Sequence, residues 1–170
     1  TGNSTTATDG TGYYSFSSVS VTSSDTITVY VSGDATYKGT TVTVTNGTTS
    51  ISDMNIYASH IIVRDDNTQA GLTISNMAYW DKDNDNDVQF TASTGTPDTL
   101  VVDSPNELYV WSTLTGKFKP NGNVTTHDLE IASATSTYTA SGTESINISG
   151  SWINSGTFTS ASSTLTFNST

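Results

Sequence analysis

One seven-residue stretch carries the strongest chemical signal in this sequence. Its carboxylates alternate with other polar residues, at Asp81, Asp83, Asp85 and Asp87. Negative charges packed this closely repel one another unless a cation offsets them. Ca²⁺ binds about six to eight oxygens, and Asp carboxylates and Asn carbonyls both suit it. The stretch therefore predicts a calcium site at these four aspartates, and the alternative is a solvated acidic loop.

The spacing begins like that of an EF-hand loop but does not complete it. Asn86 stands where the EF-hand needs a glycine for its sharp turn, and Ala92 stands where it needs a bidentate glutamate. The chain has no cysteine, and neither histidine lies near the stretch, so a d-block metal is not expected. The hypothesis is a calcium-bound β-turn and not an EF-hand.

The other residues that could do chemistry do not form a recognisable catalytic set. His60 and His127 are the only histidines, and no Gly-x-Ser-x-Gly motif supports a nucleophilic serine beside His127 and Asp128. Asp128 and Glu130 share strand parity and could face one side. No Lys or Arg follows Val124 to complete a glycosidase or lyase site. We expect both histidines to be structural and the chain not to be an enzyme.

Several aromatic residues could stack on sugar rings: Tyr79, Trp80, Tyr109, Trp111 and Trp152. Tyr79 and Trp80 directly precede the acidic stretch, where a calcium site could help to present a glycan. The alternative is that these side chains cap the core and its edges, where each buries a large area and keeps one polar atom wet.

Composition limits the classes of partner. The 170 residues include 16 Asp plus Glu against 5 Lys plus Arg, for a formal net charge of −11. This balance argues against nucleic acid, which needs a basic face, and against anionic lipid. No apolar run approaches the roughly 20 residues of a membrane span. The acidic, Thr-rich and cysteine-free composition is typical of a soluble extracellular β protein, and we read the chain, which begins at Thr1, as a mature protein or a segment of a longer one.

The last third of the chain repeats. Phe118, Tyr138 and Phe158 lie twenty residues apart. Pairs of apolar residues alternate between them, at Leu108-x-Val110, Leu129-x-Ile131, Ile146-x-Ile148 and Leu165-x-Phe167, in steps of 21, 17 and 19 residues. A period near twenty predicts a β-solenoid over residues 107–170, with the three aromatics in one internal column. A stack of hairpins, which needs a similar length per unit, is the alternative.

The first two thirds of the chain also alternate like strands. Residues 26–31 form the best predicted strand, followed by Val42-x-Val44, which the Asn46-Gly47 turn closes. Residues 59–106 form a β-rich middle region that contains the acidic loop. Its first strand is predicted at residues 61–63 and ends at Arg64.

The first 58 residues resemble a known kind of module. The turn Thr8-Asp9-Gly10, then Tyr14-Ser15-Phe16, then the strand at residues 26–31 are similar to the Ig-like sandwich of carboxypeptidase-regulatory-like and Cna-B-type modules. No Lys precedes Lys38, so the internal isopeptide bond of some of these modules is not carried over. The resemblance implies an Ig-like sandwich over residues 1–58 that lacks a strand, because residues 1–7 hold nothing apolar larger than Ala.

Residues 150–158, Gly-Ser-Trp-Ile-Asn-Ser-Gly-Thr-Phe, resemble the rungs of large bacterial adhesins and haemagglutinin-like surface proteins. Together with the N-terminal resemblance, this makes the chain similar to repeat units of very large, Thr-rich bacterial cell-surface proteins. The resemblance implies a structural or adhesive role.

The sequence thus predicts an all-β chain in three regions: an Ig-like sandwich over residues 1–58, a β-rich region over 59–106, and solenoid-like repeats or stacked hairpins over 107–170. We expect an extracellular structural module that assembles head to tail into a filament or layer, with a strand from a neighbouring copy or an adjacent module completing the sandwich. The alternative is a calcium-dependent adhesin or glycan-binding module. Neither nucleic acid nor membrane insertion is expected.

Overall fold

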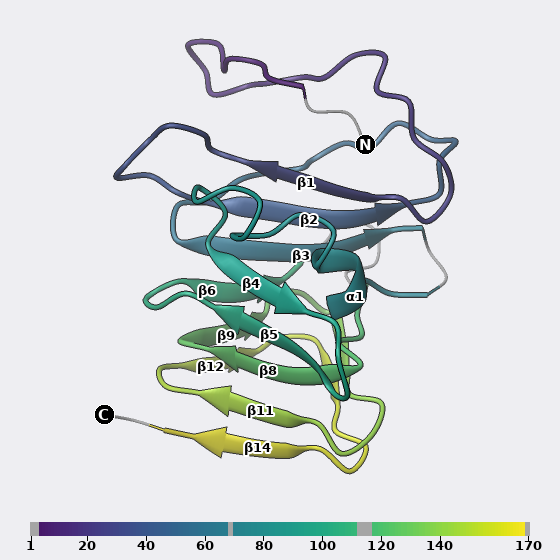
Figure 1. Ribbon diagram of the computed structural model, residues 1–170, viewed down its shortest axis with the longest axis vertical. Coiled ribbons are helices and arrows are strands. Elements are labelled where there is room, and N and C mark those ends of the chain that lie inside the picture. The colour runs from purple at the N-terminus through teal and green to yellow at the C-terminus, as the bar shows by residue number, and fades with distance from the viewer. Residues whose placement is uncertain (1–3, 68–69, 112–116, 169–170) are drawn as a thin grey trace.

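A computed structural model describes residues 4–67, 70–111 and 117–168. These residues fold into three sheets and one short helix, stacked along a single long axis (Figure 1). Sheet A contains, in spatial order, β1 (Thr26–Tyr30), β2 (Thr40–Thr45), β3 (His60–Asp66), β6 (Glu107–Val110), β9 (Asp128–Ile131) and β12 (Trp152–Asn154). Sheet B contains β13 (Thr157–Thr159), β10 (Thr137–Thr139) and β7 (Lys117–Phe118). Sheet C contains β14 (Thr164–Phe167), β11 (Ser145–Ile148), β8 (Gly122–Thr126), β5 (Asp98–Val102) and β4 (Phe90–Ser93).

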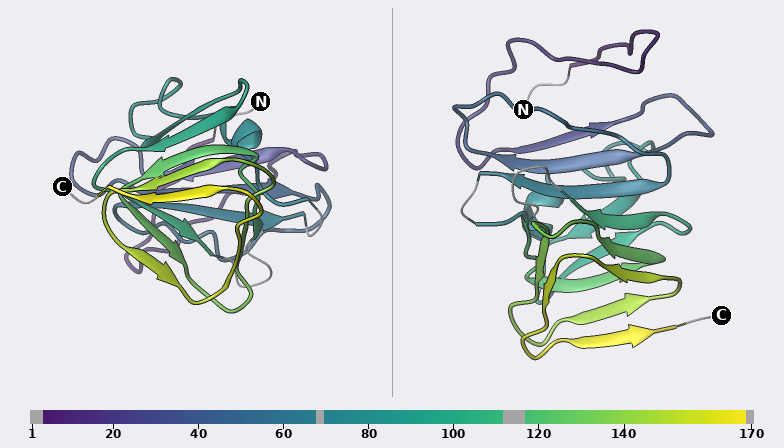
Figure 2. Two further views of the ribbon diagram at one scale, coloured as in Figure 1. Left: turned by 90° about the horizontal axis from the view of Figure 1, so that it is seen from below. Right: turned by 180° about the vertical axis from the view of Figure 1, so that it is seen from behind.

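The second half of the chain is a three-sided β-solenoid. It visits sheets A, B and C in turn, through β6–β7–β8, then β9–β10–β11, then β12–β13–β14. Every strand in these rungs pairs in parallel with its counterpart in the next rung. The view along the stack in Figure 2 shows the chain winding around one core. Hairpins would pair neighbouring strands in antiparallel fashion, so the hairpin alternative is wrong.

The three aromatics that recur every twenty residues form the predicted internal column. Phe118 pairs with Tyr138, and Tyr138 pairs with Phe158, across the parallel strands of sheet B. Both ring-to-ring distances are 5.4 Å, with the first pair edge to face. Phe118 and Tyr138 are fully buried. The column prediction is therefore confirmed.

The second repeat pattern predicted from the sequence is out of register. Leu108 and Leu129 pair with each other in sheet A, but the next member of that column is Trp152. Ile146 and Leu165 pair in sheet C, where Val124 begins the column. Each rung carries such apolar pairs in more than one of its three sheets. The 17-residue step therefore runs from Leu129 in sheet A to Ile146 in sheet C, and not between equivalent strands of two rungs.

An Ig-like sandwich is not seen in the described part of residues 1–58. The two strands there, β1 and β2, belong to the same sheet, and no other strand is described within residues 4–58. β2 pairs in parallel with β3, so that Val42 and Val44 join the same core as Ile61 and Val63. Residues 46–58 instead cross the outer face of this sheet. Sheet A therefore connects strands from all three regions distinguished in the sequence.

β3 also extends further than the sequence predicts, because Arg64 and Asp66 lie inside the strand and are buried. The Arg64 guanidinium donates to both Asp66 carboxylate oxygens, at 2.7 and 2.8 Å, and to the Asp53 carbonyl at 2.6 Å. Asp66 also accepts from the Thr43 hydroxyl. The charges of Arg64 and Asp66 thus pair with each other, and the segment that covers the sheet supplies a further acceptor. This pairing allows both side chains to be buried.

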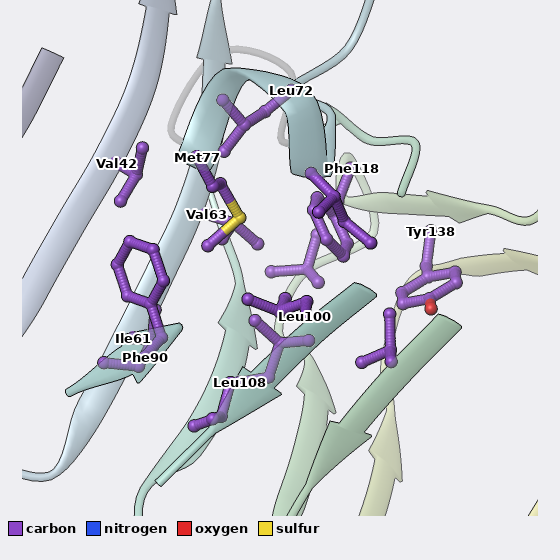
Figure 3. Close-up of a cluster of buried hydrophobic side chains, with 14 of the residues drawn as sticks. Val42, Ile61, Val63, Leu72, Met77, Phe90, Leu100, Leu108, Phe118 and Tyr138 are labelled. Atoms are coloured by element: carbon purple, nitrogen blue, oxygen red, sulfur yellow. The ribbon is translucent and has the colours of Figure 1, made fainter. Parts of the chain in front are cut away.

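An insertion after β3 closes the N-terminal end of the core. Leu72 bridges to Phe118, and α1 (Ile74–Met77) follows, with Thr73 as its N-cap. Figure 3 shows Met77 and Leu72 packed over the same cluster as Val63 and Phe118. β4 then pairs in antiparallel fashion with β5 and ends sheet C. No described helix is long and apolar enough to cross a membrane.

The hydroxyl of Tyr138 supplies a test of the aromatic column. It is buried and finds no hydrogen-bond partner among the described residues, and burial raises the pKa of the phenol. Tyr138→Phe should therefore leave the free energy of unfolding unchanged or raise it slightly, since it removes an unsatisfied polar atom. Tyr138→Ala should cost about 3–5 kcal/mol through the cavity that it leaves. Urea unfolding of both variants checks this, and a large loss in Tyr138→Phe would contradict the packing described here.

Candidate functional site

The acidic stretch forms the loop between α1 and β4. Asp81 is almost fully buried, and its two carboxylate oxygens accept hydrogen bonds from the backbone N–H groups of Asp83 at 3.0 Å and Ala92 at 2.8 Å. Asp83 itself is exposed. Asp81 therefore holds the loop in its turn and ties it to β4.

Asp85 and Asp87 reach across to the N-terminal end of sheet A. The Tyr30 hydroxyl donates to Asp85 at 2.8 Å. Asp87 accepts from the Gly33 N–H at 2.7 Å and pairs with the Lys38 ammonium at 3.2 Å. These contacts lower the pKa of Asp87, chiefly through the Gly33 hydrogen bond and next through Lys38. The loop thus fastens β1 and the turn after it to the insertion.

The four aspartates do not converge on one point. Among the described residues, no group of three or more His, Asp or Glu side chains is placed to hold a metal ion. Asp81, Asp85 and Asp87 each accept hydrogen bonds from protein donors on different elements. Calcium binding at these residues stays a prediction. The partners Tyr30 and Gly33 lie about fifty residues away in the chain, which local spacing does not reveal.

The structure brings together a second group, which the sequence did not single out, on the outer face of sheet A. Parallel pairing places His60 beside Glu107 and Tyr109 beside Glu130. His60 Nε2 lies 3.0 Å from Glu107 Oε2. The His60 ring lies 5.4 Å from that of Tyr109 and 5.8 Å from that of Tyr57, both edge to face. Only register between distant strands creates this group.

The two glutamates of this group influence the neighbouring titratable side chains. The hydrogen bond to Glu107 raises the pKa of His60, and burial opposes this in part. Burial raises the pKa of Glu130, and the charge of Glu107 raises it further. Since Glu130 has no ion pair among the described residues, protonation relieves its repulsion from Glu107.

His127 and Asp128 close a corner between β9 and β12. His127 Nδ1 lies 3.0 Å from an Asp128 oxygen, and Asp128 accepts from the Ser151 N–H. Burial raises the pKa of Asp128, but these contacts outweigh it and the net shift is downward. A Cβ at Gly150 would come within 2.4 Å of Asp128 and 2.6 Å of the His127 ring, so a larger residue there would displace these two side chains.

The aromatic residues that could stack on sugars are mostly packed. Trp80 and Trp152 lie against the core, with Trp152 4.9 Å from Phe158. Tyr109 contacts His60, as described above. Tyr79 is 73% exposed and borders a shallow hollow with Ser75 and Thr94. Tyr79 is thus the aromatic that offers most of its ring to solvent.

The last rung, β12–β13–β14, forms what we call the open rung. Its strands end all three sheets, and no described strand pairs with their outer edges. Its core layer consists of Trp152, Phe158 and Leu165, all half-buried, with Phe167 56% exposed beside Trp152. Residues 145–168 contain no Asp, Glu, Lys or Arg. The rung is therefore uncharged and partly apolar, and it is the last rung among the described residues.

Comparisons with known proteins give no relative. The chain matches no protein-family model, no curated protein and no solved structure. The resemblance to repeat units of bacterial surface proteins therefore stays a prediction.

The acidic loop yields a stability test. Asp85→Ala should lower the free energy of unfolding by about 1–2 kcal/mol, in calcium and in EGTA alike, because it removes the bond from Tyr30. Asp83→Ala, whose side chain is exposed, is the matched control and should stay within about 0.5 kcal/mol of the parent. Thermal melts of each variant in both buffers check this. A melting temperature that calcium raises in the parent, but not in a variant that combines Asp83→Ala with Asp85→Ala, would instead establish the calcium prediction.

The group on sheet A yields a pH test. A raised folded pKa means that the His60 contribution is fully present below the unfolded value of about 6.5 and is lost as pH rises through the folded value. The raised pKa of Glu130 also lowers the free energy of unfolding as pH rises, and its effect begins at a lower pH than that of His60. His60→Gln should therefore be less stable than the parent below about pH 6.5, and the difference should shrink above it. Melting curves over this range check the effect, and a difference independent of pH would contradict it.

Proposed function

We propose that this chain is an extracellular structural module that assembles end to end with copies of itself. The observation that supports this most directly is the open rung. Exposed strand edges are normally protected by charged residues, prolines or a covering segment. Here three parallel edges in register carry no charge over residues 145–168. Such an edge is suited to pairing with another strand.

Charge supports a second copy as the occupant. The net charge of −11 makes most surfaces of two copies repel each other. The open rung does not contribute to this repulsion, because its residues are neutral, and its last core layer contains aromatic side chains. Covering Trp152, Phe158 and Phe167 would also remove their exposed apolar area from water.

The opposite end of the molecule supports a head-to-tail contact. At that end β1 is the last strand of sheet A, and the N-terminal segment before it, which forms no described strand, lies above it in Figure 1. No described strand pairs with the outer edge of β1. The open rung of one copy adding to β1 of the next would be a strand complementation between different surfaces. A contact of this kind extends into a filament unless its rotation happens to close a ring.

A calcium-dependent adhesin or glycan-binding module is the second candidate. It is favoured by the exposed Tyr79 ring, which lies one residue from the partly buried Trp80 and close to the acidic loop. An aromatic face and nearby oxygen ligands are features that glycan sites use.

Charge placed on the open rung tests the first proposal. Ile153 and Phe167, 48% and 56% exposed, are changed together to Lys. The matched control is Val101→Lys, since Val101 is 45% exposed but lies on β5, an interior strand of sheet C. We expect the parent and the control to grow in mass with concentration and to form filaments, and the double variant to remain monomeric with unchanged circular dichroism.

Light scattering and negative-stain electron microscopy provide the measurement. A parent protein that stays monomeric at every concentration would overturn the proposal. A closed dimer would overturn the head-to-tail direction, because it would mean that two open rungs meet each other. Loss of assembly in Val101→Lys would show that added positive charge alone, wherever it lies, disrupts the contact.

A further inference from the structure

The outer face of sheet B carries two columns of polar side chains. Since Phe118, Tyr138 and Phe158 point into the core, their neighbours along each strand point outward. One column is Lys117, Thr137 and Thr157, joined by direct parallel pairing. The other contains Thr139 and Thr159, which pair directly, with Lys119 lining the same depression. These six residues line a shallow depression of about 280 Å³, which we call the sheet B groove.

The groove is a basic site on an acidic protein. Three of the five basic residues, Lys38, Arg64 and Lys82, form ion pairs with aspartates elsewhere. The other two, Lys117 and Lys119, line the groove, and none of the described residues in its lining is Asp or Glu. Lys119 forms no ion pair among the described residues. The groove therefore concentrates positive charge and hydroxyl groups in one place.

Gly71 forms the end of the groove next to the two lysines. Its φ is +81°, and a Cβ there would lie 3.3 Å from that of Lys119 and 3.6 Å from that of Lys117. The Gly71 N–H donates to the buried carboxylate of Asp65 at 3.0 Å. This bond holds Gly71 against the sheet. Because Gly71 has no side chain, the Cβ atoms of both lysines can lie close to its backbone.

We propose that the sheet B groove binds an acidic saccharide. Ammonium groups of Lys117 and Lys119 would bind its carboxylate or sulfate, through charge-assisted hydrogen bonds. Threonine hydroxyls both donate and accept, as sugar hydroxyls do, and rungs about 4.8 Å apart repeat them along the groove. The net charge of −11 disfavours densely charged polymers such as nucleic acid, so the ligand carries isolated charges.

The proposal concerns a different surface from Tyr79 and the acidic loop, and it is independent of end-to-end assembly. Binding is measured by ¹⁵N-HSQC titration at a protein concentration where light scattering shows monomers, so that failure of one proposal is distinguishable from failure of the other. The probes are an oligogalacturonate, a sulfated oligosaccharide and a neutral malto-oligosaccharide, with acetate and inorganic sulfate as free anions. The two acidic probes distinguish a carboxylate source from a sulfate source.

We expect an acidic oligosaccharide to shift the amides of β7, β10 and β13, with weaker binding as salt rises. Lys117→Gln with Lys119→Gln should weaken it about tenfold or more. Thr139→Val with Thr159→Val keeps the shape and should weaken it less. Lys82→Gln is the matched control, because this partly exposed lysine pairs with Asp103 outside the groove, and it should bind like the parent.

Several outcomes would overturn the proposal. Free acetate or sulfate binding as tightly as the oligosaccharides would mean an adventitious ion only. Equal binding of the neutral probe, or of an oligoglutamate peptide, would exclude an acidic saccharide as the specific ligand. Amide shifts away from sheet B, or equal weakening in Lys82→Gln, would place the binding elsewhere.

Discussion

The fold depends on one constraint, which is that inward side chains find burial only against the rungs before and after their own. A rung of about twenty residues encloses a single layer of apolar side chains and cannot exclude water from both sides of it. Parallel register satisfies the constraint, because it sets Phe118 over Tyr138 and Leu108 over Leu129 without offset. The same register brings outward residues into columns, and so creates both the group around His60 and the sheet B groove.

A stack of this kind needs a different solution at each end. At the N-terminal end the chain reverses direction in β1, inserts α1 and crosses sheet A with residues 46–58. Buried polar contacts hold these pieces in place: Arg64 with Asp66 and the Asp53 carbonyl, and Asp85 with Tyr30. Pairs like Arg64 and Asp66 add little net stability compared with apolar residues, but removing one partner leaves a buried charge. Their value here is to specify one arrangement of an irregular end.

The sequence predicts the repeating half of this structure better than the other half, for a physical reason. Phe118, Tyr138 and Phe158 recur because each faces the same layer, so spacing alone reveals the column. The end of the stack is not periodic, and its alternating Thr and Val residues in β1 and β2 suit any sheet. The Ig-like prediction rested on the strand at residues 26–31 and on Thr8-Asp9-Gly10 and Tyr14-Ser15-Phe16 before it. Likewise, four aspartates in seven residues suggest a cation, whereas the contacts of Asp85 and Asp87 lie with Tyr30 and Gly33, which only the tertiary fold brings near.

The direction of the hydrogen bonds has a mechanical consequence. β14 lies at one end of the long axis and β1 lies near the other, and the strands run across that axis (Figure 1). A tensile load applied between these ends therefore acts along the inter-rung hydrogen bonds, which open strand by strand and not all at once in shear. Each rung released in this way frees about twenty residues, or roughly 70 Å of extended chain. The molecule would lengthen under force in discrete steps, and each step could reverse by restacking on the rung that remains.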